Sequence, residues 1–169
     1  MEYTKNKIPE DVQKVINNYK EYIDTKIYYY GSVQRADYFI GQSDIDILVF
    51  TDNVETMIHK TSHYFHLNKK KFRKIIWNHK NKLIEGVKVV YRSNDPKFTL
   101  EISIYDEKYK EYILDNISKD CSFFVSILLI VLKCLYYNFQ ILPLSYYIYY
   151  KRIIFNYIKG ENTIFIKIN

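Results

Sequence analysis

The chain has 169 residues, a formal charge of +6 and 48% hydrophobic side chains. This length and composition fit one domain, or a small domain with a helical appendage, and they exclude disorder as the main description. Four glycines, three prolines and the lack of an internal repeat exclude collagen-like, low-complexity and solenoid architectures. The positive excess is compatible with a phosphate-bearing partner.

The first predicted element is a helix that opens at Pro9. Proline is favoured in the first turn of a helix, and Glu10 and Asp11 suit its positive N-terminal end. Apolar residues then recur at helical spacing, which indicates one face packed on a core. These residues are Val12, Val15, Ile16, Tyr19 and Ile23.

Two strands and a second helix are predicted next. Residues 26–30 form a strand that ends at Gly31-Ser32, and residues 33–40 form a short helix or loop. Residues 44–50 form the second strand, because their side chains alternate between apolar and mixed faces. One face carries Ile45, Ile47 and Val49, and the other carries Asp44, Asp46 and Leu48. Asp52-Asn53 then caps a helix.

The second half of the chain changes from strands to helices. Residues 83–91 and 97–105 predict two strands paired across a turn at residues 93–96. Helices are expected at about 107–117, 120–138 and 144–158, followed by a terminal strand at 163–168. The order predicts an α+β fold, with a catalytic sheet domain over residues 1–106 and a C-terminal helical lobe over residues 107–169.

Cysteine usage and hydropathy predict a cytoplasmic, reduced protein. Cys121 and Cys134 lie in an apolar stretch and are expected to be buried thiols, and the N-terminus lacks the apolar core of a secretory signal. Residues 121–150 carry one charge, Lys133, but the densest apolar run, residues 123–132, is about half of a membrane span. We therefore expect a buried core helix, with a membrane helix as the alternative.

The residue usage also points to the source of the sequence. The chain has 25 Ile, 21 Lys and 19 Tyr but one Ala, so residues with A/T-rich codons dominate. This bias indicates an A/T-rich genome, and a large DNA virus is one such source. It also warns against assigning a function to every lysine or tyrosine.

Three carboxylates stand in otherwise apolar strands. Asp44 and Asp46 are two residues apart, so both project from the same face at a spacing of about 6–7 Å. A divalent cation between them would remove their repulsion, and Mg²⁺ (or Mn²⁺) prefers such oxygen ligands. Glu101 would complete a triad if its strand lies beside the first, and a triad can hold two ions. The alternative is a solvated sheet face.

The turn before these acids favours the metal site. Gly31 ends the preceding strand and allows close approach of a phosphate, and Ser32 adds a hydroxyl. The next segment offers free backbone N–H groups at a helix start. A phosphate-binding turn shortly before a metal-binding strand predicts a nucleotide site.

Together these residues resemble the signature of the polymerase β-type nucleotidyltransferase superfamily. The shared pattern is Gly31-Ser32, ten residues, then Ser43-Asp44-Ile45-Asp46 and an apolar run. The resemblance implies a mixed sheet with flanking helices, a nucleotide bound by Gly31, Ser32 and Ser43, and metal ions held by three catalytic acids. These acids are Asp44, Asp46 and Glu101.

Two positions and one loop length depart from the family pattern. The third acid is commonly Asp, so Glu101 is a less regular match than the pair, and Asp106 at the end of its strand is a weaker candidate. Ala36 stands where many members carry a second glycine, and the loop is slightly longer than usual.

A second resemblance is to the central domain of poly(A)- and poly(U)-polymerase-like enzymes. It rests on Lys133 in an apolar helix and on Ser145-Tyr146 at the start of the next helix, and it implies that they bind triphosphate and base. The alternatives are a lysine that reaches the surface, a serine that caps its helix and a tyrosine in the core. Tyr137 stands where a second lysine is often found.

Two further clusters, one of basic residues and one of histidines, could bind a ligand. The basic run can follow a nucleic-acid backbone or form a solvated hairpin or helix end. It contains Lys69, Lys70, Lys71, Arg73 and Lys74. His59, His63 and His66 share one helix face and could bind a transition metal, but a solvent-facing stripe is the favoured interpretation.

We therefore expect an enzyme that transfers a nucleoside monophosphate from an NTP to an acceptor hydroxyl, with RNA 3′ ends as the favoured acceptor. A minimal DNA-repair-type polymerase, a modifier of proteins or small molecules, and a non-catalytic nucleotide-binding module are the alternatives. A protein partner or a second copy is a possible requirement, and no membrane association is expected.

Overall fold

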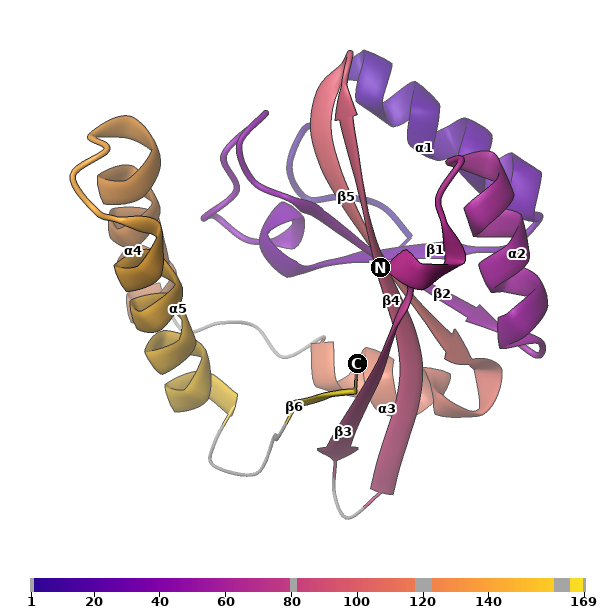
Figure 1. Ribbon diagram of the computed structural model, residues 1–169. Helices are drawn as coiled ribbons and strands as arrows, with labels where there is room; N and C mark the ends of the chain where they lie inside the picture. Colours follow the sequence, from indigo (N-terminus) through magenta and orange to yellow (C-terminus); the bar gives the residue numbers. More distant parts are fainter. Residues whose placement is uncertain (1, 80–81, 118–122, 160–164, 169) are drawn as a thin grey trace.

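The computed structural model describes residues 2–79, 82–117, 123–159 and 165–168, and its architecture is α+β (Figure 1). Six strands form one sheet in the order β1-β2-β5-β4-β3-β6. The strands are β1 (Ile27–Tyr30), β2 (Ile45–Thr51), β3 (Arg73–His79), β4 (Lys82–Asn94), β5 (Lys97–Asp106) and β6 (Phe165–Ile168). The predicted fold class, a mixed sheet with flanking helices, is confirmed.

Strand β5 lies between β2 and β4 and determines how the acidic residues meet. It runs parallel to β2 and antiparallel to β4, with which it forms the hairpin predicted from the sequence. The parallel register places Asp46 opposite Glu101, and the antiparallel register of β1 places Tyr30 on the other side of Asp46. Side chains that are level in neighbouring strands share a face, so these three side chains lie in one row.

Helices α1 (Glu10–Ile23) and α2 (Val54–Tyr64) cover one face of the sheet (Figure 1). The apolar face of β2, which carries Ile45, Ile47 and Val49, packs against them as predicted. The side chain of Asn53 accepts a hydrogen bond from the backbone N–H of Thr56 at 2.9 Å, so the predicted N-cap of α2 is confirmed.

Helix α3 (Lys110–Ile117) packs on the opposite face, after a short 3₁₀ turn. Its buried Ile113 joins a cluster with Leu48, Phe50 and Trp77 on the strands. This helix belongs to the segment expected as a helical lobe, yet it contributes to the core of the sheet domain. The division of the chain at residue 106 stays a prediction.

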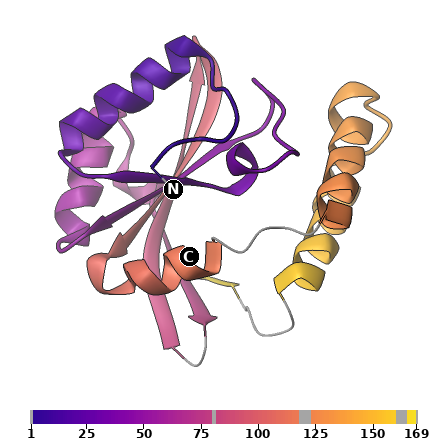
Figure 2. The ribbon, with the colours of Figure 1, turned by 180° about the vertical axis from the view of Figure 1, so that it is seen from behind.

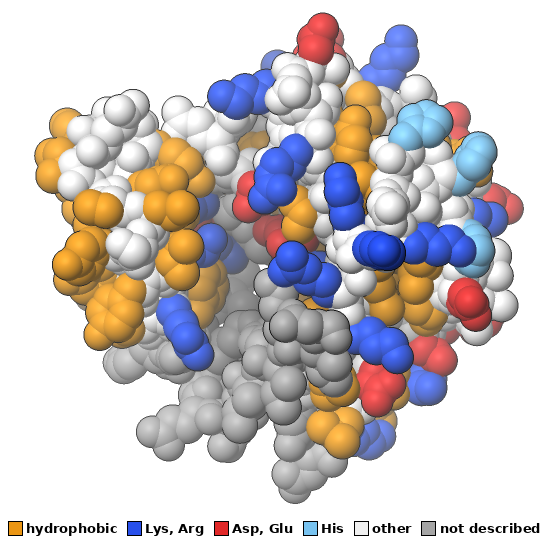
Figure 3. Space-filling view, viewed as in Figure 1, with side chains coloured by type: hydrophobic (Ala, Val, Ile, Leu, Met, Phe, Trp, Pro, Cys, Tyr) orange, Lys and Arg blue, Asp and Glu red, His pale blue; other side chains and the backbone are white. Residues whose placement is uncertain are grey.

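The last two helices form a hairpin beside the sheet, as both views show (Figures 1 and 2). Helix α4 (Phe123–Lys133) continues into a π-helical turn (Cys134–Asn138), and α5 (Leu144–Lys159) follows. Fourteen large hydrophobic side chains in this hairpin are exposed by 36% to 77%. Figure 3 shows them as orange atoms that cover much of α4 and α5.

This exposure corrects the expectation of a buried core helix. Helix α4 buries Val125, Leu129, Leu132 and Lys133, but its other apolar side chains face outward, because its partner α5 covers one side. None of the helices in the described part of the chain is long and apolar enough to cross a membrane. Cys134 is a half-buried free thiol, and Cys121 lies outside the described residues.

The basic segment supplies a strand that the sequence pattern does not single out. Strand β3 pairs with β4 on one side and with β6 on the other. Its Trp77 is buried against the sheet while Arg73 and Lys74 are exposed, and the choice between nucleic-acid binding and a solvated hairpin stays a prediction. Lysines on the solvent face hide the alternation of a half-buried strand.

Candidate active site

The site begins with two carboxylates that face each other across neighbouring strands. Asp46 on β2 and Glu101 on β5 are register partners on the face opposite α1 and α2, and both are half-buried. Burial, together with the negative charges of Glu101 and Asp44, raises the pKa of Asp46 well above its ordinary value. Asp46 and Glu101 therefore form a pair whose repulsion must be relieved by a proton or a cation.

The backbone of Gly31 closes one side of this pair. Gly31 has a φ of +72°, and a Cβ atom built there would lie 2.1 Å from Oδ2 of Asp46. Only glycine allows both this backbone conformation and this approach. The sequence analysis assigned the glycine to phosphate approach, whereas the structure shows that the Asp46 carboxylate occupies the space beside it.

A tyrosine and a lysine complete the surroundings of Glu101. The hydroxyl of Tyr30 donates a hydrogen bond to Oε1 of Glu101 at 3.4 Å and lies 3.3 Å from the hydroxyl of Ser103. The ammonium of Lys88 forms an ion pair with the same Oε1 atom. The Tyr30 phenol stays protonated, because burial and the negative charges of Asp46 and Glu101 raise its pKa well above the ordinary value.

Asp44 lies just before β2, and its side chain is exposed. The hydroxyl of Ser32 donates a long hydrogen bond of 3.5 Å to the Asp44 carbonyl, which links the Gly-Ser turn to the start of the strand. Ser32 belongs to a single 3₁₀ turn over Gly31–Gln34, which overlaps the segment 33–40 predicted as a short helix or loop.

The donor set fits a divalent cation at the Asp46–Glu101 pair. Two facing carboxylates are hard oxygen ligands of the kind that Mg²⁺ and Mn²⁺ prefer. Asp44 is not gathered with them: within the described ranges, no three His, Cys, Asp or Glu side chains form a group that could hold a metal ion. The structure thus brings two of the three predicted ligands together and leaves the third, Asp44, exposed just before β2.

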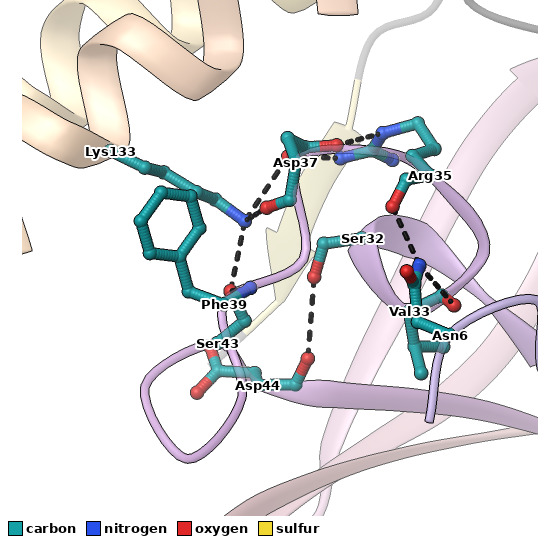
Figure 4. A network of polar contacts seen from close by, with 9 residues as sticks. All are labelled: Asn6, Ser32, Val33, Arg35, Asp37, Phe39, Ser43, Asp44 and Lys133. Atoms are coloured by element: carbon teal, nitrogen blue, oxygen red, sulfur yellow. Dashed lines mark hydrogen bonds and ion pairs between the residues drawn. The ribbon is translucent and has the colours of Figure 1, made fainter. Parts of the chain in front are cut away.

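Lys133 reaches from α4 into the loop between the Gly-Ser turn and β2 (Figure 4). Its ammonium lies 2.6 Å from the carbonyl oxygen of Asp37, 3.1 Å from Oδ2 of Asp37 and 3.0 Å from the hydroxyl of Ser43. An ammonium has three N–H donors, and these three contacts use all of them. Lys133 is therefore buried with an anionic partner from the chain itself.

Asp37 is a residue that the sequence analysis missed. It is fully buried and also accepts two hydrogen bonds from Arg35, at 2.7 and 3.1 Å. Burial alone would raise its pKa, but the charges of Arg35 and Lys133 outweigh burial and hold the pKa of Asp37 below its ordinary value. The available signal was Lys133 itself, because a lone charge in an apolar stretch requires an anion; the partner assigned to it was a triphosphate.

Ser145 and Tyr146 are both exposed in the first turn of α5. The buried residue is the neighbouring Tyr147, whose ring stacks on Tyr136 with centroids 4.4 Å apart. Burial raises the pKa of Tyr147 above its ordinary value, and the neighbouring Tyr137 adds to this shift. Whether Ser145 and Tyr146 contact a nucleotide stays a prediction.

The remaining candidates lie outside this site. The side chains of the basic run are all exposed, and Figure 3 shows blue side chains spread over the face of the sheet domain. The run consists of Lys69, Lys70, Lys71, Arg73 and Lys74. His63 hydrogen-bonds to the Tyr22 hydroxyl at 2.9 Å, and His59 to the Lys69 ammonium at 2.7 Å.

A mixed sheet that carries facing acids beside a Gly-Ser turn defines the nucleotidyltransferase class of proteins. The model of the nucleotidyltransferase domain family matches residues 12–119. This match covers more than half of the chain, which belongs to that family. It extends from α1 through α3, so the α4–α5 hairpin lies beyond it. The comparisons with curated proteins and with solved structures found no match.

Proposed function

We propose that the chain transfers a nucleoside monophosphate from an NTP to an acceptor hydroxyl and depends on Mg²⁺ or Mn²⁺. The acceptor oxygen forms a bond to the α-phosphorus, the bond from the α-phosphorus to the bridging oxygen breaks, and pyrophosphate leaves. The observation that carries this proposal is the Asp46–Glu101 pair in register on parallel strands beside the Gly-Ser turn.

The three acids have separate roles in this proposal. Asp46 and Glu101 would hold the divalent cation, and Asp44, exposed at the start of β2, would complete the ligand set when the nucleotide arrives. A bound cation supplies positive charge to the transferring phosphoryl group. Glu101 would also accept the proton of the acceptor hydroxyl, because its side chain is partly exposed.

The triphosphate would bind at Gly31 and Ser32. The turn offers backbone N–H groups, and the Ser32 hydroxyl is held by a single long hydrogen bond that a phosphate oxygen could replace. Ser43 is engaged by Lys133, so both would contact the triphosphate only if a phosphate displaced Asp37 from the lysine. Under this condition we propose that Lys133 binds the triphosphate, and we propose that Ser145 and Tyr146 bind a phosphate and the base.

An RNA 3′ end is the acceptor that we favour. The net charge of +6 and the exposed basic run suit a polyanion, whose binding weakens as salt rises. The likeness of Lys133 and Ser145-Tyr146 to poly(A)- and poly(U)-polymerase-like enzymes points to the same acceptor. Transfer to DNA or to a protein instead of RNA would identify one of the alternative acceptors.

The test is a transfer assay with each labelled NTP, Mg²⁺ or Mn²⁺, and RNA, DNA and protein acceptors. We expect transfer to RNA that is lost on chelation and abolished in Asp46→Asn. Asp52→Asn is the matched control, because it removes an exposed carboxylate just after β2 without touching the acid pair. Equal transfer by wild type and Asp46→Asn would reject the site, and nucleotide binding without any product would favour a non-catalytic module.

A second copy of the chain is the partner that we propose for the surface of the α4–α5 hairpin. The exposed apolar side chains there provide on the order of 1,000 Å², more than the roughly 300–600 Å² patch of a typical monomer. This area suits one side of a dimer, which needs about 800 Å². Residues 121–160 contain no acidic residue and few basic ones, as expected for the centre of an interface.

A further inference from the structure

Lys88 lies on the same face of the sheet as the acid pair, one level along from Glu101. It lies on β4, opposite Ser103 of β5, and therefore projects from the face that carries Glu101. Glu101 is thus bounded by Asp46 from β2 on one side and by Lys88 from β4 on the other. The neighbouring strands β2, β5 and β4 therefore carry Asp46, Glu101 and Lys88 on the same face of the sheet.

The ion pair of Lys88 with Glu101 differs from an ordinary surface pair. Isolated exposed ion pairs contribute little to stability, because water screens both partners. Here the side chains of Lys88 and Glu101 are only 34% and 21% exposed, and a second carboxylate faces the first. The ammonium supplies the positive charge that this carboxylate pair requires and that a divalent cation would otherwise supply.

We propose that Lys88 is a resident counter-cation of the acid pair: it neutralises Glu101 while no metal ion is bound and releases it when a divalent cation binds. Lys88 is a positioning residue that sets the affinity for the cation. The inference rests on the proposed metal site and deepens it. A divalent cation must displace the ammonium from Glu101, so its affinity is lower than two carboxylates alone would give.

The test measures Mn²⁺ binding to the full chain without nucleotide or acceptor, by calorimetry and by the electron paramagnetic resonance of free Mn²⁺. We expect Lys88→Met to bind Mn²⁺ about tenfold more tightly, the effect of one unit of charge at contact distance in a partly solvated site. Lys88→Arg should stay close to wild type, and Lys97→Met, an exposed lysine at the start of β5, should leave the affinity unchanged.

A second readout, which does not depend on enzymatic activity, is the melting temperature of the protein. Metal-free Lys88→Met should melt below wild type, because the facing carboxylates lose their counter-charge, and saturating Mn²⁺ should remove most of the difference. In a Glu101→Gln background, Lys88→Met should no longer change the affinity for Mn²⁺. Unchanged or weaker binding of Mn²⁺ by Lys88→Met would overturn the inference.

The outcomes also separate this inference from the proposed function. Tighter Mn²⁺ binding by Lys88→Met in a protein that transfers no nucleotide would support the counter-cation and reject the activity. If the protein transfers nucleotides but wild type and Lys88→Met bind Mn²⁺ with equal affinity, the activity is supported and the counter-cation is rejected. Failure of both wild type and Lys88→Met to bind Mn²⁺ would reject the metal site and the inference together.

Discussion

At Gly31 the lack of a side chain determines the shape of the site. The residue combines a positive φ with contact between its backbone and the Asp46 carboxylate. Each feature alone disfavours a side chain, and together they make the position specific for glycine. The Gly-Ser turn and the acid pair are therefore one structural unit.

We expect Gly31→Ala to lower the free energy of unfolding by about 2–4 kcal/mol, because the new methyl group adds a clash with Asp46 to the strain of a positive φ. It should also weaken divalent-metal binding, since Asp46 must move. Chemical denaturation and Mn²⁺ titration measure the two effects.

Gly41 provides the matched control for this substitution. Its φ is +74°, and a Cβ atom there would meet nothing within 4 Å. Gly41→Ala should therefore cost only about 1 kcal/mol, the strain of the backbone conformation. Equal losses of stability in the two variants would show that the contact with Asp46 has no energetic role.

The sequence predicted the acid pair but not its neighbours. Alternation marked Asp46 and Glu101 as acids within apolar strands, but it left open whether they share a face of the sheet, which depends on the pairing and register of β2 with β5. Asp37 and Lys88 were missed, since their partners come from distant segments and no local pattern marks them. Which strands are neighbours had to come from the structure.

At the scale of elements, α4 is attached to the sheet domain by a buried ion pair. Lys133 and Asp37 meet in a region that excludes water, and Arg35 completes the charges. Further contacts join the same parts: Phe39 with Tyr137 and Arg35 with the ring of Phe155. Contacts with the α4–α5 hairpin thus hold the loop that precedes Asp44 in place.

We expect Lys133→Met to destabilise the protein by about 3 kcal/mol, because it removes a buried ammonium that neutralises Asp37 and donates to the Ser43 hydroxyl, and leaves the buried Asp37 carboxylate with its Arg35 contacts. Asp37→Asn should cost a similar amount. The double variant should lose less than the sum of the two single losses, since the partners act as a unit. Additive losses in urea denaturation would argue against the ion pair.

The same pair gives a pH dependence with a defined sign. The pKa of Asp37 is lower in the folded protein, so its ionised form stabilises the fold above the ordinary value of 3.8. That contribution is lost as the pH falls below this value and through the folded-state pKa. The stability gap between wild type and Asp37→Asn should therefore be constant near neutral pH and narrow below about pH 4. A gap that does not change between pH 3 and pH 7, measured by denaturation, would contradict this account.

The elements themselves were predicted unevenly. Strong periodicity identified α1, α2, β2 and β5, with ends that differ by a residue or two. Strand β3 was not recognised because its lysines hide the alternation of apolar and polar residues. The predicted burial of α4 was wrong, because hydropathy alone does not distinguish a core helix from a helix in an exposed hairpin.

At the scale of the whole molecule, the α4–α5 hairpin carries most of the exposed apolar side chains in the described residues. If a second copy covers them, association should increase with concentration. We expect Phe124→Ser combined with Ile141→Ser, which changes side chains that are 77% and 72% exposed, to shift the protein toward a monomer in size-exclusion chromatography with light scattering.

Leu83→Ser is the control for this experiment. Leu83 is 65% exposed but lies on β4, away from the hairpin, so its substitution should leave the oligomeric state unchanged. A wild-type protein that stays monomeric at high concentration would exclude the second copy as the occupant of this surface.

The position of β5 between β2 and β4 has a consequence for synthesis on the ribosome. Strands β1 to β4 are synthesised before β5, and the inner edges of the β1–β2 and β3–β4 pairs have no partner in the sheet until β5 is made. Residues 97–106 then enter between them and satisfy both edges. The same insertion delivers Glu101 to Asp46. A nascent chain released before this point would hold neither a continuous sheet nor the paired acids, so structural integrity and chemical competence arise in a single event.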